Sequence, residues 1–228
     1  MKILDGAFGT LVQEYTLPEE AYMLDGQDAR GCVDVLCLTR PDVVADIHRR
    51  YAEAGANIIT TNSLCANAFA SDRVYDISRR AAELAKATGR FVAGSIGTTS
   101  DKPADAYRAH AQGLIDGGAD ALQLETVTDL RSAREAIAAI RDVSADIPIM
   151  ISATLDPSGR LYSGQTVEQF CAAMAEARPM SIGLNCGYGP EHLLPYLRRL
   201  SAVAPCEVSF HPNAGLPGHY ITPVTYTQ

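Results

Sequence analysis

The sequence has no tryptophan and few other aromatic residues, which limits how its interior can be filled. Aromatic residues make up 7% of the 228 residues, whereas hydrophobic residues make up 47%. Alanine, valine, isoleucine and leucine must therefore supply most of the core, which fits an α/β protein better than an aromatic-rich binding module. The length suits one large domain or two small ones.

Long apolar runs and concentrated positive charge are also missing. No run approaches the roughly 18 apolar residues needed to span a membrane, and the N-terminus lacks a signal-peptide core. The net charge of −8 argues against nucleic acid as a partner. Arginine pairs at 49–50, 79–80 and 198–199 are expected on solvated helix faces. The sequence predicts neither a nucleic-acid nor a membrane partner.

The six cysteines form no adjacent pair and no CxxC run, and the chain has no HExxH motif. In a chain of this length without a signal peptide, widely spaced cysteines are typical of reduced thiols. We therefore predict a cytoplasmic protein. The cysteines are Cys32, Cys37, Cys65, Cys171, Cys186 and Cys206.

Short apolar runs alternate with amphipathic helical stretches along the whole chain. The runs show little polar alternation, as expected for parallel strands buried on both faces. Strands are predicted at 2–5, 57–61, 90–94, 121–125, 147–154, 181–185 and 207–211. Helices are predicted at 41–54, 74–88, 104–116, 129–143, 167–177 and 191–203, the last delayed or kinked by Pro195. Twice, glycine follows the end of a predicted helix as its cap and precedes a predicted strand. These glycines are Gly55 and the pair at 117–118.

The alternation predicts one domain, residues 1–228, with a parallel sheet. Seven strands and six helices match a (β/α)8 TIM-type barrel that lacks its last helix–strand–helix unit. The rival architecture is an open doubly wound sheet. Against it, no Gly-rich phosphate loop follows the first strand, and residues 6–10 match one only weakly.

Polar residues stand where the predicted strands end, which is where barrel proteins build active sites. Asp5 and Glu125 are suited to an ammonium group, the Gly6 and Ala7 amides to a carboxylate, and Ser95 adds a hydroxyl donor. Such a set suits an amino acid zwitterion. Asp5 is equally well explained as the cap of an Asp-Gly turn. A carboxylate at Glu125 is costly to bury unpaired, which favours a function.

Cys186 follows the strand at 181–185, so its thiol stands at a strand end. A lone cysteine is often an inert core residue, and a catalytic zinc needs three protein ligands with an open position. His211, beside Pro212, is expected to order a loop rather than bind metal.

Taken together, these stretches resemble the homocysteine S-methyltransferase family, in particular the homocysteine-binding barrel of cobalamin-dependent methionine synthase. No single motif is decisive, but the matches run in order along the chain. They are residues 4–10, 51–62, 92–97, 117–120 with 125–126, 158–160 with 163–165, 183–186 and 211–217. The last run points to the cobalamin-dependent branch.

The resemblance implies a methyltransferase that forms methionine from homocysteine, with Asp5, Gly6, Ala7, Ser95 and Glu125 holding the amino acid. Cys186 would be one of three thiolate ligands of a zinc ion that activates the homocysteine thiol. The donor would be methylcobalamin on another domain or a cobalamin-binding protein. The family's other two ligands, an adjacent cysteine pair on the eighth strand, are absent from this sequence.

Three hypotheses follow. The first is a homocysteine methyltransferase whose zinc needs ligands from a partner chain or from Cys206, His211 or His219. The second is a non-catalytic homocysteine-binding or amino-acid-binding subunit, completed by another chain or as a homo-oligomer that covers the open barrel edge. The third uses another donor, such as S-methylmethionine or a betaine.

Overall fold

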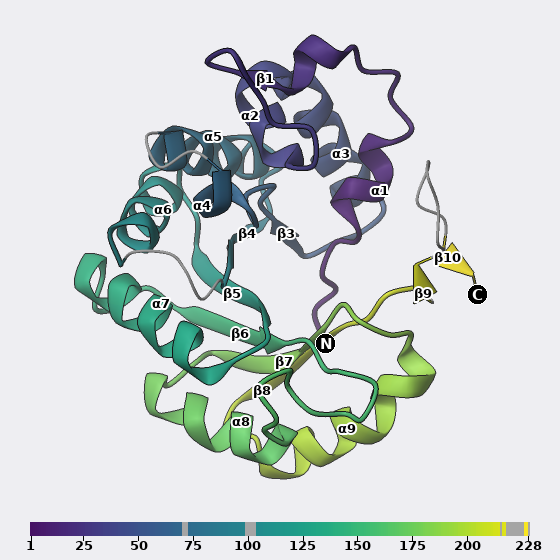
Figure 1. Ribbon diagram of the computed structural model, residues 1–228, viewed down its shortest axis with the longest axis vertical. Helices are drawn as coiled ribbons and strands as arrows, with labels where there is room; N and C mark the ends of the chain where they lie inside the picture. The colour runs from purple at the N-terminus through teal and green to yellow at the C-terminus, as the bar shows by residue number, and fades with distance from the viewer. Residues whose placement is uncertain (70–72, 99–103, 215, 218–225, 228) are drawn as a thin grey trace.

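A curled parallel sheet with helices on its outer side organises the chain (Figure 1). The computed structural model describes residues 1–69, 73–98, 104–214, 216–217 and 226–227. The sheet order is β3-β4-β5-β6-β7-β8, and every neighbouring pair is parallel. Sequential parallel order with a helix between strands is the pattern of a barrel wall rather than of a doubly wound sheet. The six strands form a half-barrel.

The predicted strands are found, with one reduced to a single bridge. Leu4 bridges in parallel to Ile58, so residues 2–5 take the place of a first strand without forming one. The other bounds are β3 Ile58–Thr60, β4 Phe91–Gly97, β5 Ala121–Val127, β6 Ile149–Ala153, β7 Ser181–Asn185 and β8 Glu207–His211. The strands β4 and β5 continue beyond the predicted ends, which places Ser95 within a strand rather than after it and Glu125 before the end of its strand rather than at it.

The six long helices agree with prediction in place and nearly in length. They are α3 Pro41–Glu53, α5 Val74–Lys86, α6 Ala104–Asp116, α7 Leu130–Val143, α8 Val167–Met174 and α9 Pro190–Val203. Both predicted glycine caps have the left-handed backbone they were expected to supply, with φ of 102° at Gly55 and 94° at Gly118. The last helix does not begin later because of Pro195, since α9 begins at Pro190 and contains Pro195.

Residues alternate between the two faces of each strand. In β5, Leu122 and Leu124 join the large apolar cluster with the helices. Gln123 and Glu125 are buried on the other face, toward the inside of the curl. In β5 the inner face therefore carries polar side chains, while the outer face joins the core.

Residues 8–40 form a compact set of short elements that the periodicity did not predict. They comprise α1 Phe8–Val12, the 3-10 turns Glu19–Tyr22 and Val33–Val35, the two-residue strands β1 Met23–Leu24 and β2 Gln27–Asp28, and α2 Leu36–Thr39. Leu36, Cys37 and Val12 pack against Val44 and Ile47 of α3. This N-terminal lobe thus closes one end of the row of helices (Figure 1).

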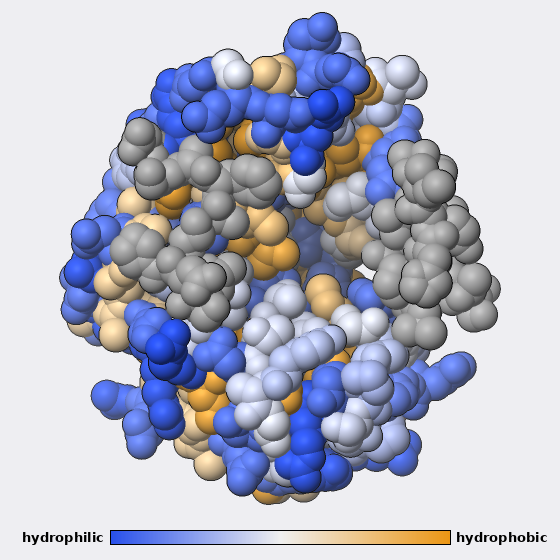
Figure 2. Space-filling model, in the orientation of Figure 1, coloured by the Kyte–Doolittle hydropathy of each residue, from blue (hydrophilic) through white to orange (hydrophobic). Residues whose placement is uncertain are grey.

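The face seen in Figure 2 is hollowed near its centre, between the N-terminal lobe and the side that carries α8 and α9. Among the described residues, β8 has a sheet partner only on its β7 side. The strands β9 Leu216–Pro217 and β10 Tyr226–Thr227 pair with each other. None of the described helices has the length and apolar character needed to cross a bilayer, and all six cysteines are free.

Candidate active site

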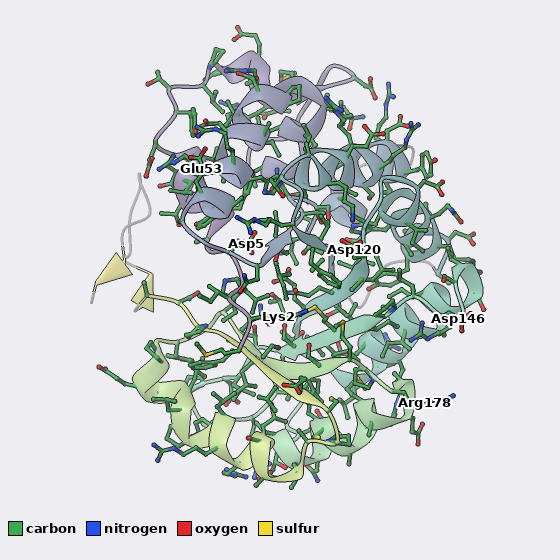
Figure 3. The ribbon with its side chains drawn as sticks, turned by 180° about the vertical axis from the view of Figure 1, so that it is seen from behind. Lys2, Asp5, Glu53, Asp120, Asp146 and Arg178 are labelled. Carbon is green, nitrogen blue, oxygen red and sulfur yellow. The ribbon has the colours of Figure 1, made fainter. Side chains whose placement is uncertain are left out.

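Asp5 lies inside the molecule, where the chain runs beside β3 (Figure 3). Its amide donates to the Ile58 carbonyl at 3.0 Å, and its Oδ2 accepts the Thr60 amide at 2.8 Å. Oδ1 is buried and has no hydrogen-bond partner among the described residues. Burial, opposed by the Thr60 hydrogen bonds and aided by the charge of Glu125, raises the pKa of Asp5 to about 7. Asp5 therefore presents one unsatisfied carboxylate oxygen, and does more than cap a turn.

Glu125 and Ser95 form a buried pair across neighbouring strands. The Ser95 hydroxyl donates to Glu125 Oε1 at 2.5 Å, and the two side chains are 1% and 9% exposed. Burial raises the pKa of Glu125, while the Ser95 hydrogen bond and the nearby His211 act in the opposite direction. No lysine or arginine in the described part of the chain forms an ion pair with Glu125 or Asp5. A buried carboxylate without a cation is unfavourable on its own, and this pair is suited to receive one.

Asn185, at the end of β7, joins this pair to Cys186. Its Nδ2 lies 3.4 Å from Glu125 Oε2, 2.9 Å from Thr126 Oγ1 and 3.3 Å from Cys186 Sγ. Its Oδ1 accepts the Ser152 hydroxyl at 2.7 Å and the Thr126 amide at 3.0 Å. The predicted substrate residue Glu125 and the predicted metal ligand Cys186 are therefore in one network. Sequence reasoning placed Asn185 at a strand end but gave it no role.

Thr126 and Cys186 both have left-handed backbones, with φ of 57° and 55°. This conformation costs a non-glycine residue roughly 1–2 kcal/mol, and such strain is concentrated at functional sites. The Cys186 amide donates to the His211 carbonyl at 3.0 Å, which ties the thiol to the end of β8. Burial raises the pKa of the Cys186 thiol, while hydrogen bonds from Thr126 and Asn185 oppose the rise.

Gly6 and Ala7 lie next to Asp5, as the chain requires, but the structure gives Gly6 a different reason for being glycine. A Cβ at Gly6 would lie 2.8 Å from the Tyr51 hydroxyl. That hydroxyl donates to the Ala7 carbonyl at 3.0 Å. The missing side chain makes room for Tyr51, whereas the sequence argument reserved that room for a ligand carboxylate.

The described residues do not fit a zinc site. No group of three or more histidine, cysteine or acidic side chains in the described ranges is arranged to hold a metal. Cys206, one of the three candidates named to supplement Cys186, is excluded, because Cys206 precedes β8 while Cys186 follows β7. Since those strands are parallel, with Ser181 opposite Glu207, the two cysteines lie at opposite ends of the sheet. His211 is adjacent to Cys186, and His219 lies outside the described residues.

The buried Asp5 carboxyl makes stability depend on pH. Its folded pKa of about 7 exceeds its ordinary 3.8, so the folded protein keeps a proton that the unfolded chain releases. The stabilisation is complete below about pH 4 and is lost as the pH rises through 7. Between pH 5 and 8 the Asp5 carboxyl should lower the free energy of unfolding by about 2.6 kcal/mol, and we expect Asp5→Asn to abolish this part of the pH dependence. Urea titrations of both proteins at the two pH values measure this, and parallel pH profiles would contradict it.

Comparison with solved structures defines the class of protein. The fold is shared with the homocysteine methyltransferase MmuM from Escherichia coli in its apo form, with a TM-score of 0.75 at 22% identity over 94% of this chain and 82% of that one. The metallated form of MmuM gives a TM-score of 0.74 at 22% identity, covering 94% and 84% of the two chains. A putative phosphonomutase from Burkholderia cenocepacia shares the fold more loosely, with a TM-score of 0.50 at 20% identity over 72% of each chain. The protein has a barrel-type α/β fold with a polar site at the carboxyl ends of its strands.

A family model narrows this class. The model described as homocysteine S-methyltransferase matches residues 2–227. The chain belongs to the homocysteine S-methyltransferase family, as its motifs predicted.

Proposed function

We propose that the protein binds homocysteine at the inner, carboxyl end of the sheet and that the homocysteine sulfur accepts a methyl group there. The observation that supports this most is the buried Ser95–Glu125 pair, connected through Asn185 to Cys186. The charge of Glu125 acts on Asp5, and neither carboxyl has a lysine or arginine partner among the residues that the structure describes. An ammonium group between them would supply the missing cation.

Neighbouring residues would hold the remaining groups of the ligand. The Gly6 and Ala7 amides would hold its carboxylate, and the hydroxyl of Ser95 would keep Glu125 aimed at the ammonium group. The thiol end would then point toward Cys186. In the transfer, the donor–carbon bond breaks, a sulfur–carbon bond forms and the sulfur loses its proton. We propose methylcobalamin, carried on another domain or protein, as the donor, because residues 211–217 resemble the cobalamin-dependent branch.

Cys186 remains our proposed metal ligand, and further ligands would have to come from outside the described residues. Zinc is the metal that the family resemblance implies. Because no group of three or more histidine, cysteine or acidic side chains in the described ranges could hold a metal, we assign no step to it.

A second candidate is a binding subunit that does not transfer methyl groups until another chain completes it. The observation that favours it is the unpaired outer edge of β8 in the described part of the sheet. Unpaired strand edges are normally covered. A homo-oligomer or a partner polypeptide would serve equally well.

Calorimetric titration tests the proposed function. We expect homocysteine to bind at least about tenfold more tightly than 4-mercaptobutyrate, which lacks the amino group, because hydrogen bonds to charged groups contribute roughly 1.5–3 kcal/mol. Equal affinities, or no binding of homocysteine, would refute the assignment of Asp5 and Glu125. Incubation with methylcobalamin then separates the two candidates: methionine formation supports the enzyme, and binding without methionine supports the subunit.

A further inference from the structure

A buried carboxylate in the N-terminal lobe, Asp34, lies outside the site described above. Asp34 is 3% exposed, and its Oδ2 accepts the Cys65 amide at 2.6 Å. The Ala66 amide and the Cys32 side chain also hydrogen-bond to it, while burial raises its pKa to about 7. No described lysine or arginine pairs with it. Burying a carboxylate without a cation is unfavourable, which favours a role for Asp34 that offsets this cost.

The segment that Asp34 holds follows β3 and runs into the short helix α4 Ala66–Phe69. We call its residues 61–67 the β3 turn. The same lobe holds this turn at a second point: the Asn62 Nδ2 donates to the Val33 carbonyl at 2.9 Å. The Cys37 thiol donates to the Asn62 carbonyl at 3.2 Å. The β3 turn is therefore fixed to the N-terminal lobe by side chains from both partners.

The β3 turn also fixes the part of β4 that extends beyond the last residue of β3. Pairing of the two strands stops at Thr60 and Ala93. Beyond this point, Thr61 Oγ1 accepts the Ser95 amide at 2.8 Å, and the Ser63 hydroxyl donates to the Ser95 carbonyl at 2.8 Å. The Gly97 amide then donates to the Leu64 carbonyl at 3.0 Å. Side chains and main chain of the β3 turn thus replace the missing strand neighbour of Ser95.

We propose that Asp34 is a positioning residue for the substrate site, acting through the β3 turn on Ser95 and through Ser95 on Glu125. The role rests on the proposed function, since the Ser95–Glu125 pair is the part of the site assigned to the ammonium group. The N-terminal lobe is then a support of the site, although it contributes no side chain to the Ser95–Glu125–Asn185 network.

Hydrogen exchange tests, without any ligand, whether Asp34 fixes Ser95 through the β3 turn. In Asp34→Asn, one acceptor oxygen is replaced by an NH2 group that faces amide donors. We expect exchange at the Ser95 and Gly97 amides to accelerate at least about tenfold, corresponding to the loss of one net hydrogen bond. The Leu122 amide, which donates to Pro148, should not change. The control Ile77→Val loosens the apolar cluster beside Val35 and Ala66 without touching these hydrogen bonds. Unchanged Ser95 protection in Asp34→Asn would overturn the proposal.

Ligand discrimination tests the functional part. Partial unfolding lowers the affinity for every ligand by the same factor, whereas a displaced Glu125 lowers it only for ligands with an ammonium group. We expect Asp34→Asn to reduce the preference for homocysteine over 4-mercaptobutyrate by about tenfold, and Ile77→Val to preserve it. In a Ser95→Ala background, Asp34→Asn should have no further effect on this preference.

Failure of the proposed function and failure of the role of Asp34 give different results. A wild-type protein with no preference for homocysteine refutes the proposed function, and the exchange experiment still decides whether Asp34 fixes Ser95. A wild-type preference that Asp34→Asn leaves intact, or that declines additively in the Ser95→Ala background, refutes the role of Asp34 alone.

Discussion

Replacing Glu125 with glutamine should reduce the affinity for homocysteine by at least about 30-fold. Removing one partner of a buried, hydrogen-bonded charge pair typically costs 2–5 kcal/mol of binding free energy, and 2 kcal/mol corresponds to about that factor. Glutamine keeps an oxygen that can accept the Ser95 hydroxyl, but it has no charge for the ammonium group. Calorimetric titration with homocysteine measures the loss.

The matched control is Glu168→Gln. Glu168 lies in the first turn of α8 on the outer side, pairs with Arg199 at 2.7 Å and has a side chain that is 37% exposed. The same chemical change there should leave the affinity unaltered. Because burial raises the pKa of Glu125, neutralising it should not destabilise the fold, and circular dichroism should match the wild type. A folded Glu125→Gln protein with wild-type affinity would remove Glu125 from the binding site.

Replacing Gly183 with alanine should destabilise the protein by about 3 kcal/mol or more. Gly183 faces Ser209 across the β7–β8 pair, and a Cβ at Gly183 would lie 2.1 Å from both the Ser209 carbonyl oxygen and its Oγ. The hydroxyl can rotate away, but the carbonyl belongs to the backbone of β8, so the strands must separate. Overpacking of this kind reaches or exceeds the upper end of the usual 1–3 kcal/mol range. Urea-induced unfolding followed by circular dichroism measures the change.

Gly9→Ala provides the comparison. Gly9 lies in α1, and a Cβ there meets nothing within 4 Å. Alanine is favoured over glycine in a helix by roughly 0.5–1 kcal/mol, so this variant should be as stable as the wild type or slightly more so. If Gly183→Ala unfolded at the same urea concentration as Gly9→Ala, the close packing of β7 on β8 would be wrong.

The repeating units could be predicted from the sequence because each one carries its own local signals. The helix Ala104–Asp116 and the strands Ser181–Asn185 and Glu207–His211 have the predicted bounds. Apolar periodicity and glycine caps define such elements without reference to the rest of the chain. The N-terminal lobe was missed because its 3-10 turns and two-residue strands are too short to show any period.

Only the part of the site that depends on where strands end could be predicted from the sequence. The residue types at the strand ends indicated an amino acid site, and the family resemblance named its ligand. The Asn185 network could not be predicted, because it joins side chains 60 residues apart in the chain through their rotamers. Cys206 could have been excluded from the sequence alone, since a residue that precedes a parallel strand lies at the end opposite to one that follows it.

The side-chain amide of Asn185 has too few hydrogens for its neighbours. Its two N–H groups face three acceptors, on Glu125, Thr126 and Cys186. A ligand ammonium that takes over Glu125 leaves both hydrogens for the Thr126 oxygen and the Cys186 sulfur. In the proposed binding mode, what binds at Glu125 therefore determines how many hydrogen bonds the Cys186 sulfur receives, without any movement of the backbone.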